Sequence, residues 1–476
     1  MITGFPEKRI MRINNKLLKA GIGYTVGNIL VKGAVFLTLP IFTRLMSPEN
    51  FGLYSIYLTY GYIIYIFMGM VLHNTIKNAR YDFPFKIENY VSSIFTFNVF
   101  TLSLCLIVAY LLPDNFIRVI NFKKSIIYLL VFQSFSVSVF TIYNVYLSLS
   151  YSYKNYIKVT FLNSFLSIVL SIFFICNFFQ NESYIGRILG TTLPYVFLSL
   201  VIIWIIYQKA DNIFNIQYIK YGLSFSLPLI IHGLSQVVLG QIDRIIIQNY
   251  CGSYFTGLFS FAIIFNTVYS VFISSFDNVW GPWLYEKLNN ANYSEIRRKT
   301  KKHMVIMTII YTYILFFVPE LTRILATKEY FISVYSAVPL LLSGYFMYLY
   351  TIVVNVEYFF KKTSYIAIGT LLGGSVNVIL AIMLIPVYGY KIAAYVHLLS
   401  YVVYFLFHYY SAYNLLKKDI FGLKVLGYNI LFVAVISLFV LYTVEYIHIR
   451  MAVLTIITGF ILMRVKLLVK NLPMND

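Results

Sequence analysis

Three cationic side chains lie within long apolar stretches of the sequence or at their ends. Lys32 is near the middle of the first stretch, and Arg44 and Arg244 are at the far ends of two helix-length stretches. A charge inside an apolar span costs free energy, so it marks a binding pathway or has a partner of opposite charge. A guanidinium group also presents paired N–H donors that match a phosphate. We therefore take these three cations as candidate substrate-binding residues for an anionic group.

Each cation also has a structural alternative. Lys32 can form a salt bridge to a carboxylate on a neighbouring span instead of facing a water-filled cavity. Its stem does not easily reach either membrane surface from the middle of a helix. Arg44 and Arg244 can pair locally or meet outer water, and Asp243 is such a local partner for Arg244. The sequence leaves these alternatives open.

Five ionisable residues between positions 222 and 413 could bind a coupling ion. Histidine titrates near neutral pH, which suits it to a proton relay, and a carboxylate can hold a proton or a sodium ion. The alternatives are structural: a histidine hydrogen-bonded among packed helices, Asp277 paired with Lys287, and Glu357 paired with Lys361. The candidates for ion coupling are His232, Asp243, Asp277, Glu357 and His397.

The sequence contains no phosphate-binding loop, metal-ligand spacing or nucleophile elbow. Its three cysteines have no spacing typical of a disulfide or a metal site. The loops are short, so no extramembrane domain is expected to house catalysis. We therefore expect a protein that is not an enzyme and has no metal or cofactor. The 45 tyrosines and 42 phenylalanines could stack on sugar rings or simply face lipid, and composition does not separate these alternatives.

The candidate residues are set among apolar segments that recur along the whole chain. Of the 476 residues, 60% are hydrophobic and only 11% are charged, and each apolar run suits a hydrocarbon core about 30 Å thick. The sequence thus predicts an all-α polytopic membrane protein with about fourteen spans. These are 18–42, 51–75, 90–112, 125–150, 157–179, 184–207, 222–249, 256–283, 304–325, 334–359, 364–386, 390–413, 425–447 and 451–469.

The net charge of +20 is distributed unevenly between the loops. If the spans alternate from a cytoplasmic N-terminus, most lysines and arginines fall in inner segments, including the run from Arg297 to Lys302. This is the positive-inside pattern, which sets topology. We therefore expect both termini in the cytoplasm, membrane lipids as neighbours and no nucleic-acid partner.

A short motif occurs twice, once after each of two spans. Gly52-Leu53-Tyr54-Ser55 and Gly257-Leu258-Phe259-Ser260 both follow an apolar run and a polar break. An internal repeat of this kind, with an even number of spans per copy, predicts two lobes related as parallel repeats. We expect a six-helix lobe at 1–207, a cytoplasmic linker at 208–221, a second six-helix lobe at 222–413 and an extra helix pair at 425–469.

Several of these motifs together resemble the Wzx-type polysaccharide flippases, which belong to the superfamily that includes MATE exporters and the lipid II flippase. The resemblance extends to about residue 415 and depends on the order of the motifs. They are Thr43-Arg44-Leu45 with Pro48, Phe51, Gly52 and Tyr54; Ser226-Leu227-Pro228; Asp243-Arg244; Gly257-Leu258-Phe259-Ser260; Trp280-Gly281-Pro282; Asn377 with Ile385-Pro386 and Gly389; and Ala393-Ala394.

The resemblance implies a flippase of the bacterial inner membrane, working in O-antigen, lipopolysaccharide or capsule biosynthesis. Its substrate would be an undecaprenyl-diphosphate-linked oligosaccharide, moved by ion-coupled alternating access between the lobes. A monomer is expected, with possible association with a polysaccharide polymerase and a chain-length regulator. The last two spans resemble the extra pair of the lipid II flippase, where such helices form a groove for the lipid tail.

Two other classes of protein remain open. A MATE-type drug or metabolite exporter would be expected to hold a cation on acidic groups deep in a lobe, whereas the deepest charge in this sequence is Lys32. A membrane protein of polysaccharide assembly that does not transport is the other alternative. An enzyme such as a polymerase would need a long outer loop, which the sequence lacks.

Overall fold

The computed structural model describes Gly33 and residues 36–84, 86–113, 115, 120, 122–150 and 152–470, with side chains described as far as Met463. Every regular element in these residues is helical. Twelve of the described helices are long and apolar enough to cross a membrane, and two shorter apolar helices, Phe36–Leu45 and Ile447–Met463, overlap the first and last predicted spans. The expected all-helical membrane architecture is confirmed.

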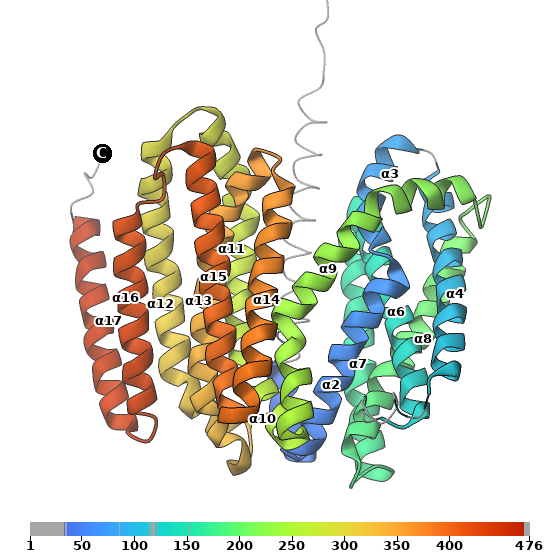
Figure 1. Ribbon diagram of the computed structural model, residues 1–476, viewed down its shortest axis with the longest axis horizontal. Coiled ribbons are helices and arrows are strands. Elements are labelled where there is room, and N and C mark those ends of the chain that lie inside the picture. Colours follow the sequence, from blue (N-terminus) through green and yellow to red (C-terminus); the bar gives the residue numbers. More distant parts are fainter. Residues whose placement is uncertain are drawn as a thin grey trace, which may run out of the picture. The chain divides into compact units, whose positions relative to one another are not determined.

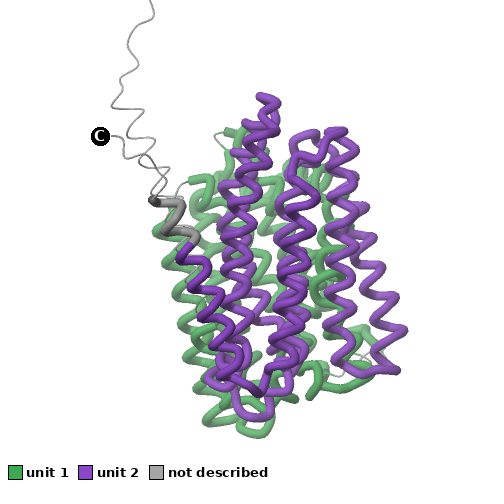
Figure 2. Tube along the Cα trace, turned by 90° about the vertical axis from the view of Figure 1, so that its left-hand side faces the viewer, with its two compact units in different colours: residues 1–257 green, residues 258–476 purple. Residues whose placement is uncertain are grey.

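The chain divides into two compact units, residues 1–257 and 258–476, which Figure 2 distinguishes by colour. In the first unit, α6 packs against α2, α4 and α8, and α7 packs against α8. The elements of this unit are α2 (Pro48–Gly69), η1 (Leu72–Thr75), α3 (Ile76–Asp82), α4 (Ile87–Leu111), α6 (Lys124–Leu149), α7 (Tyr153–Asn177), α8 (Ser183–Tyr207), α9 (Ile216–Cys251) and the start of α10 (Ser253–Ala262).

The second unit is built around one buried helix, α13 (Val334–Phe359). It contacts the neighbouring helices on several sides, and most of its apolar window is buried. It has small residues at Ser336-Ala337 and at Ser343-Gly344, which allow close helix packing there. Its neighbours are α11 (Ile264–Asn289), α12 (Tyr293–Leu325), η2 (Lys328–Ser333), α14 (Thr363–Tyr388), α15 (Lys391–Leu416) and α16 (Leu423–Tyr442), and α17 (Ile447–Lys470) packs against α12.

The helix α9 is a single helix of 36 residues, roughly 54 Å long at 1.5 Å per residue. It changes direction along its length (Figure 1) and contains Pro228, which removes a backbone donor and favours a bend. Its first turns are already helical from Ile216, so only the first part of the predicted linker 208–221 is irregular. The first compact unit ends at Gly257, whereas the second lobe predicted from the sequence repeat begins at residue 222. The lobe boundaries stay a prediction.

The glycines of the two repeated motifs lie against each other's helix backbone. A Cβ atom on Gly52 would be 1.9 Å from the carbonyl oxygen of Ser253, and one on Gly257 would be 1.8 Å from that of Pro48. Neither distance is possible for a real side chain, so the backbones of α2 and α10 approach this closely only because both positions are glycine. The repeated motif therefore forms a reciprocal packing contact.

We expect Gly52→Ala and Gly257→Ala each to lower stability by about 1–3 kcal/mol, the usual range for overpacking. The matched control is Gly240→Ala in α9, because a Cβ atom there meets nothing within 4 Å. Thermal unfolding of the detergent-purified protein measures all three. Equal melting temperatures for the three variants would contradict the packing contact.

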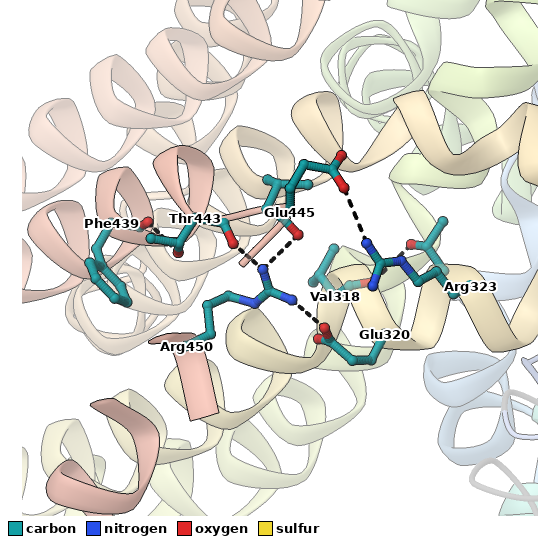
Figure 3. A network of polar contacts seen from close by, with 9 residues as sticks. Val318, Glu320, Arg323, Phe439, Thr443, Glu445 and Arg450 are labelled. Atoms are coloured by element: carbon teal, nitrogen blue, oxygen red, sulfur yellow. Dashed lines mark hydrogen bonds and ion pairs between the residues drawn. The ribbon is translucent and has the colours of Figure 1, made fainter. Parts of the chain in front are cut away.

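A buried ion pair joins α17 to α12 (Figure 3). Arg450 is fully buried, donates to the carbonyl oxygens of Thr443 and Val444, and pairs with Glu320. A second ion pair lies nearby. Nη2 of Arg323 is 3.3 Å from Oε2 of Glu445, and both side chains are exposed. The guanidinium group of Arg450 thus caps the end of α16 and fixes the last hairpin to α12.

Candidate functional site

The predicted substrate-binding cations have different surroundings. Lys32 lies outside the described residues. Arg44 is exposed, and its Nη1 donates to the carbonyl oxygen of Pro40, 2.8 Å away, in its own helix. Arg244 is half-buried on α9 and donates to the side chain of Gln241. Of the two cations that the structure describes, Arg244 has a charge that interacts with Tyr62, a residue that lines a cavity.

A cavity of about 280 Å³ lies within the first unit, between α2, α6 and α8. Four of its tyrosines come from α2 at a spacing that places them on one face of that helix, and a fifth comes from α8. Each tyrosine presents an apolar ring face and a polar hydroxyl. The tyrosines that line the cavity are Tyr54, Tyr57, Tyr62, Tyr65 and Tyr195, and its polar residues are Gln133, Ser134 and Thr191.

Arg187 is placed beside this cavity by α8, one turn before Thr191. Its guanidinium group lies over the ring of Phe42, 3.5 Å from the centroid, and 5.4 Å from the centroid of Tyr54. Its Nη1 is buried and has no hydrogen-bond partner among the described residues. No described carboxylate pairs with it, so the two aromatic rings and the side chain of Tyr54 supply its attractive contacts. Arg187 is therefore a half-buried cation whose Nη1 remains able to donate.

Arg244 approaches the same cavity from α9. Its charge interacts with Tyr62, which lines the cavity, and with the neighbouring Asp243. Asp243 is itself almost completely buried, which supports the local pairing considered from the sequence. Two arginines from different helices thus lie against two of the cavity tyrosines.

The surroundings of this cavity suit a sugar attached to an anion. The C–H face of a pyranose is apolar and stacks on an aromatic ring, while its hydroxyls need hydrogen-bond partners of the kind that Gln133 and Thr191 provide. An anionic group nearby could accept a hydrogen bond from Nη1 of Arg187, which has no other acceptor among the described residues. The sequence leaves the role of its many tyrosines open, whereas the structure places five of them in the lining of one cavity.

A second cluster of polar groups lies within the other unit. Glu357 on α13 and His408 on α15 are fully buried, and Nδ1 of His408 is 2.9 and 3.0 Å from the two carboxylate oxygens. The partner of Glu357 is thus a histidine, and the alternative pairing with Lys361 is wrong. The rings of Tyr350 and Tyr404 lie 4.9 and 4.7 Å from the imidazole centroid.

The other imidazole nitrogen is aimed at a glycine. A Cβ atom on Gly369 would be 2.3 Å from Nε2 of His408, so only glycine leaves room for the ring. Nε2 is buried and has no hydrogen-bond partner among the described residues. Because Nδ1 is engaged by the carboxylate, Nε2 is the ring nitrogen that remains open to a further hydrogen bond.

Asp277 belongs to the same neighbourhood. Its Oδ1 accepts from Nδ2 of Asn355 at 2.9 Å, and both carboxylates interact electrostatically with Tyr358. The alternative pairing with Lys287 is wrong, because that lysine pairs with Glu286 and Glu295 at 3.1 and 3.3 Å. Asp277 and Glu357 therefore contribute to one polar cluster held by α11, α13 and α15.

The two remaining candidates neither line the cavity nor belong to the Glu357–His408 pair. His232 is half-buried on α9, and His397 is buried on α15 with its ring 5.0 Å from that of Tyr401. Arg187 and His408 are the residues that the sequence reasoning missed. Both lie inside predicted spans, 184–207 and 390–413, so the rule that ionisable residues in spans mark function would have found them.

No group of three or more described histidine, cysteine, aspartate or glutamate residues could hold a metal ion.

Comparison with solved structures defines the class of fold. The chain is similar to the lipid II flippase MurJ in an inward closed conformation, with a TM-score of 0.67 and 16% identity over 94% of this chain and 100% of that one. It is also similar to an inward-facing multidrug resistance MATE family transporter of the MOP superfamily, with a TM-score of 0.62 and 15% identity over 84% of this chain and 99% of that one. The fold is that of these transporters.

Sequence comparison identifies the family. The model of a family described as "Polysaccharide biosynthesis protein" matches residues 17–288, more than half of the chain, so the protein belongs to that family. Two proteins of Haemophilus influenzae are similar to it. One, an uncharacterized membrane protein, is 26% identical over 74% of this chain and 86% of its own length. The other, Lsg locus putative protein 1, is 23% identical over 74% and 87%.

Proposed function

We propose that this protein is a flippase that moves an undecaprenyl-diphosphate-linked oligosaccharide across the bacterial cytoplasmic membrane. The observation that carries the proposal is the tyrosine-lined cavity with Arg187 and Arg244 beside it. The family match to polysaccharide biosynthesis and the fold shared with MurJ support it. The oligosaccharide would be an O-antigen or capsule repeat unit of lipopolysaccharide or capsule synthesis. Alternating access would expose the site to each side in turn.

The arginines would lower the cost of bringing a diphosphate into the membrane. A phosphate loses hydration when it leaves water, and a cation in a low-dielectric site offsets part of that loss. Arg187 has an unused donor for this purpose, and Arg44 and Lys32 remain proposed contributors. The tyrosine rings would hold the sugars without reading one particular hydroxyl pattern.

The Glu357–His408 pair would couple transport to a proton gradient. Protonation at Nε2 of His408 changes the charge of a fully buried pair, and burial makes any such change expensive unless the surrounding helices adjust. The helices α13 and α15 pack closely against each other, so a shift of one would displace the other. The other proposed coupling groups are Asp277, Asp243, His232 and His397. A monomer with both termini in the cytoplasm would suffice for this mechanism.

A translocation assay tests the proposed function. The full chain is reconstituted in proteoliposomes with an undecaprenyl-diphosphate-linked oligosaccharide, and a membrane-impermeant lectin reports its appearance on the opposite face. We expect faster appearance than in protein-free vesicles. A MATE-type exporter would instead move drug-like cations and leave the glycolipid in place. That outcome would overturn the proposal.

We expect Glu357→Gln to remove the dependence of this transport on an imposed pH gradient. The amide keeps the size of the side chain but loses the charge-assisted hydrogen bond to His408, worth roughly 1.5–3 kcal/mol, or about tenfold or more in an equilibrium. The rate with and without the gradient is compared at equal protein content. Glu329→Gln is the control, since this glutamate is exposed on η2 and belongs to neither site. Gradient-driven transport by Glu357→Gln at the native rate would exclude the pair from coupling.

A further inference from the structure

A basic pocket lies within the second unit, where α12 and α16 begin. Its volume is about 820 Å³, and it opens to the surface. Four of its lining side chains are cationic and one is a carboxylate. They are Arg297, Arg298 and Lys301 on α12, Lys424 on α16 and Asp419 in the loop before α16, joined by Tyr293, Ser294, Gly422, Leu423 and Val425. Neither the transport site nor the coupling pair uses any of these residues.

Asp419 organises one wall of this basic pocket. It accepts from the backbone N–H groups of Gly422 and Leu423 at 2.7 and 2.8 Å, and it pairs with Nη2 of Arg297 at 3.3 Å. Burial raises the pKa of Asp419, but the Leu423 and Gly422 N–H groups, the Tyr409 hydroxyl and Arg297 outweigh burial and leave that pKa below its usual value. Asp419 therefore stays ionised at neutral pH and holds Arg297 in place.

The remaining cations of the pocket are not neutralised. Arg298, Lys301 and Lys424 are exposed and form no ion pair with any described residue. The pocket therefore keeps an excess of positive charge after Arg297 and Asp419 have paired. Like charges gathered this closely repel one another, and an anion bound between them would relieve that repulsion.

The pocket lies where a lipid headgroup would be. The helix α12 has 33 residues, roughly 50 Å, so its first turns extend beyond a hydrocarbon core about 30 Å thick. Along α16, which starts at the pocket, the side chains of Leu423, Tyr428 and Leu431 are 60%, 73% and 63% exposed. A cationic pocket thus continues directly into an apolar, uncovered helix face.

We propose that this pocket binds the phosphate headgroup of an anionic glycerophospholipid, with an acyl chain lying along α16. Basic pockets between helices on the cytoplasmic side of a membrane protein are suited to such headgroups. The cations would hold the phosphate, and Leu423 and Tyr428 would contact the chain. A soluble phosphate would use the cations but not the apolar face. The proposal does not depend on the transported substrate.

Native mass spectrometry of the detergent-purified full chain tests this site. Phosphatidylglycerol or cardiolipin is titrated against phosphatidylethanolamine, with inorganic phosphate as a separate arm. We expect the anionic lipids to be retained in preference to phosphatidylethanolamine and to raise the melting temperature, and phosphate alone to do neither. Binding should weaken at high salt, because the contacts with the exposed cations are screened.

The variant Arg298→Gln/Lys301→Gln/Lys424→Gln should weaken retention of the anionic lipid by about tenfold or more, from loss of roughly 1 kcal/mol per cation near the surface. The matched control replaces three exposed lysines of the first unit, Lys154, Lys158 and Lys209, by glutamine. Lys301→Arg/Lys424→Arg should bind as the native protein does. Equal loss in the control, unchanged retention in the triple variant, or equal stabilisation by inorganic phosphate would each overturn the proposal.

Discussion

Arg187→Ala is expected to reduce export of the lipid-linked oligosaccharide by about 10- to 100-fold, the equivalent of one charge-assisted hydrogen bond of roughly 1.5–3 kcal/mol. The cation is half-buried beside the tyrosine-lined cavity, and its Nη1 has no hydrogen-bond partner among the described residues. Removing it would take away one of the donors proposed for the diphosphate in a low-dielectric site. Translocation in proteoliposomes, normalised to inserted protein, measures the effect.

Arg187→Lys separates charge from shape. Lysine keeps the charge but loses the planar group that stacks on Phe42 and Tyr54, so it should retain part of the activity. Arg80→Ala, at an exposed position of α3, is the matched control for loss of an arginine. If Arg187 served packing alone, Arg187→Met would fill the space and export normally. Normal export by Arg187→Met would therefore contradict a role in binding.

Arg450→Met is expected to destabilise the second unit by about 3–5 kcal/mol, the range for breaking a buried ion pair by removing one partner. The substitution would leave Glu320 charged and poorly solvated, and would strip two carbonyl groups at the end of α16 of their donor. Thermal unfolding, and protection of α17 from proteolysis, measure the loss.

The structure offers a control for this effect within the same view (Figure 3). Arg323 and Glu445 pair at the same distance as many buried ion pairs, but their side chains are 43% and 59% exposed. Arg323→Met should therefore change stability by only about 0–1 kcal/mol. The double variant Arg450→Met/Glu320→Gln should recover part of the stability, because no unpaired charge remains. A double variant no more stable than Arg450→Met would argue against the ion pair as the cause.

Hydropathy was sufficient to predict the order of the described spans, but it shortened the helices that continue into water. The predicted span 334–359 coincides with α13, which is apolar along most of its length. By contrast α12 begins at Tyr293 and not at 304, because its first three turns are rich in lysine and arginine. The helical pattern continues there while the hydrophobicity stops. A criterion based on apolar length cannot detect such an extension.

The sites were less predictable because their members come from distant parts of the chain. Glu357 was a candidate, but its partner His408 is 51 residues away, and only the packing of α13 on α15 brings them together. The tyrosines of the cavity are few among the many in the sequence, and their common helix face becomes informative only when α6 and α8 enclose it. Arg187 was not selected from the sequence, because Lys32 lies nearer the middle of its predicted span and was taken as the main candidate.

The packing of α9 has a consequence for the way the protein is made. Tyr218 and Ile219, from the start of this helix, are buried in the core of the first unit together with Leu72 and Tyr90. Six spans can therefore be inserted by the translocon before the core that they share is closed. The first unit matures only after the ribosome has moved beyond Cys251, and a nascent chain that is stalled in the linker would expose a hydrophobic surface to chaperones and membrane proteases.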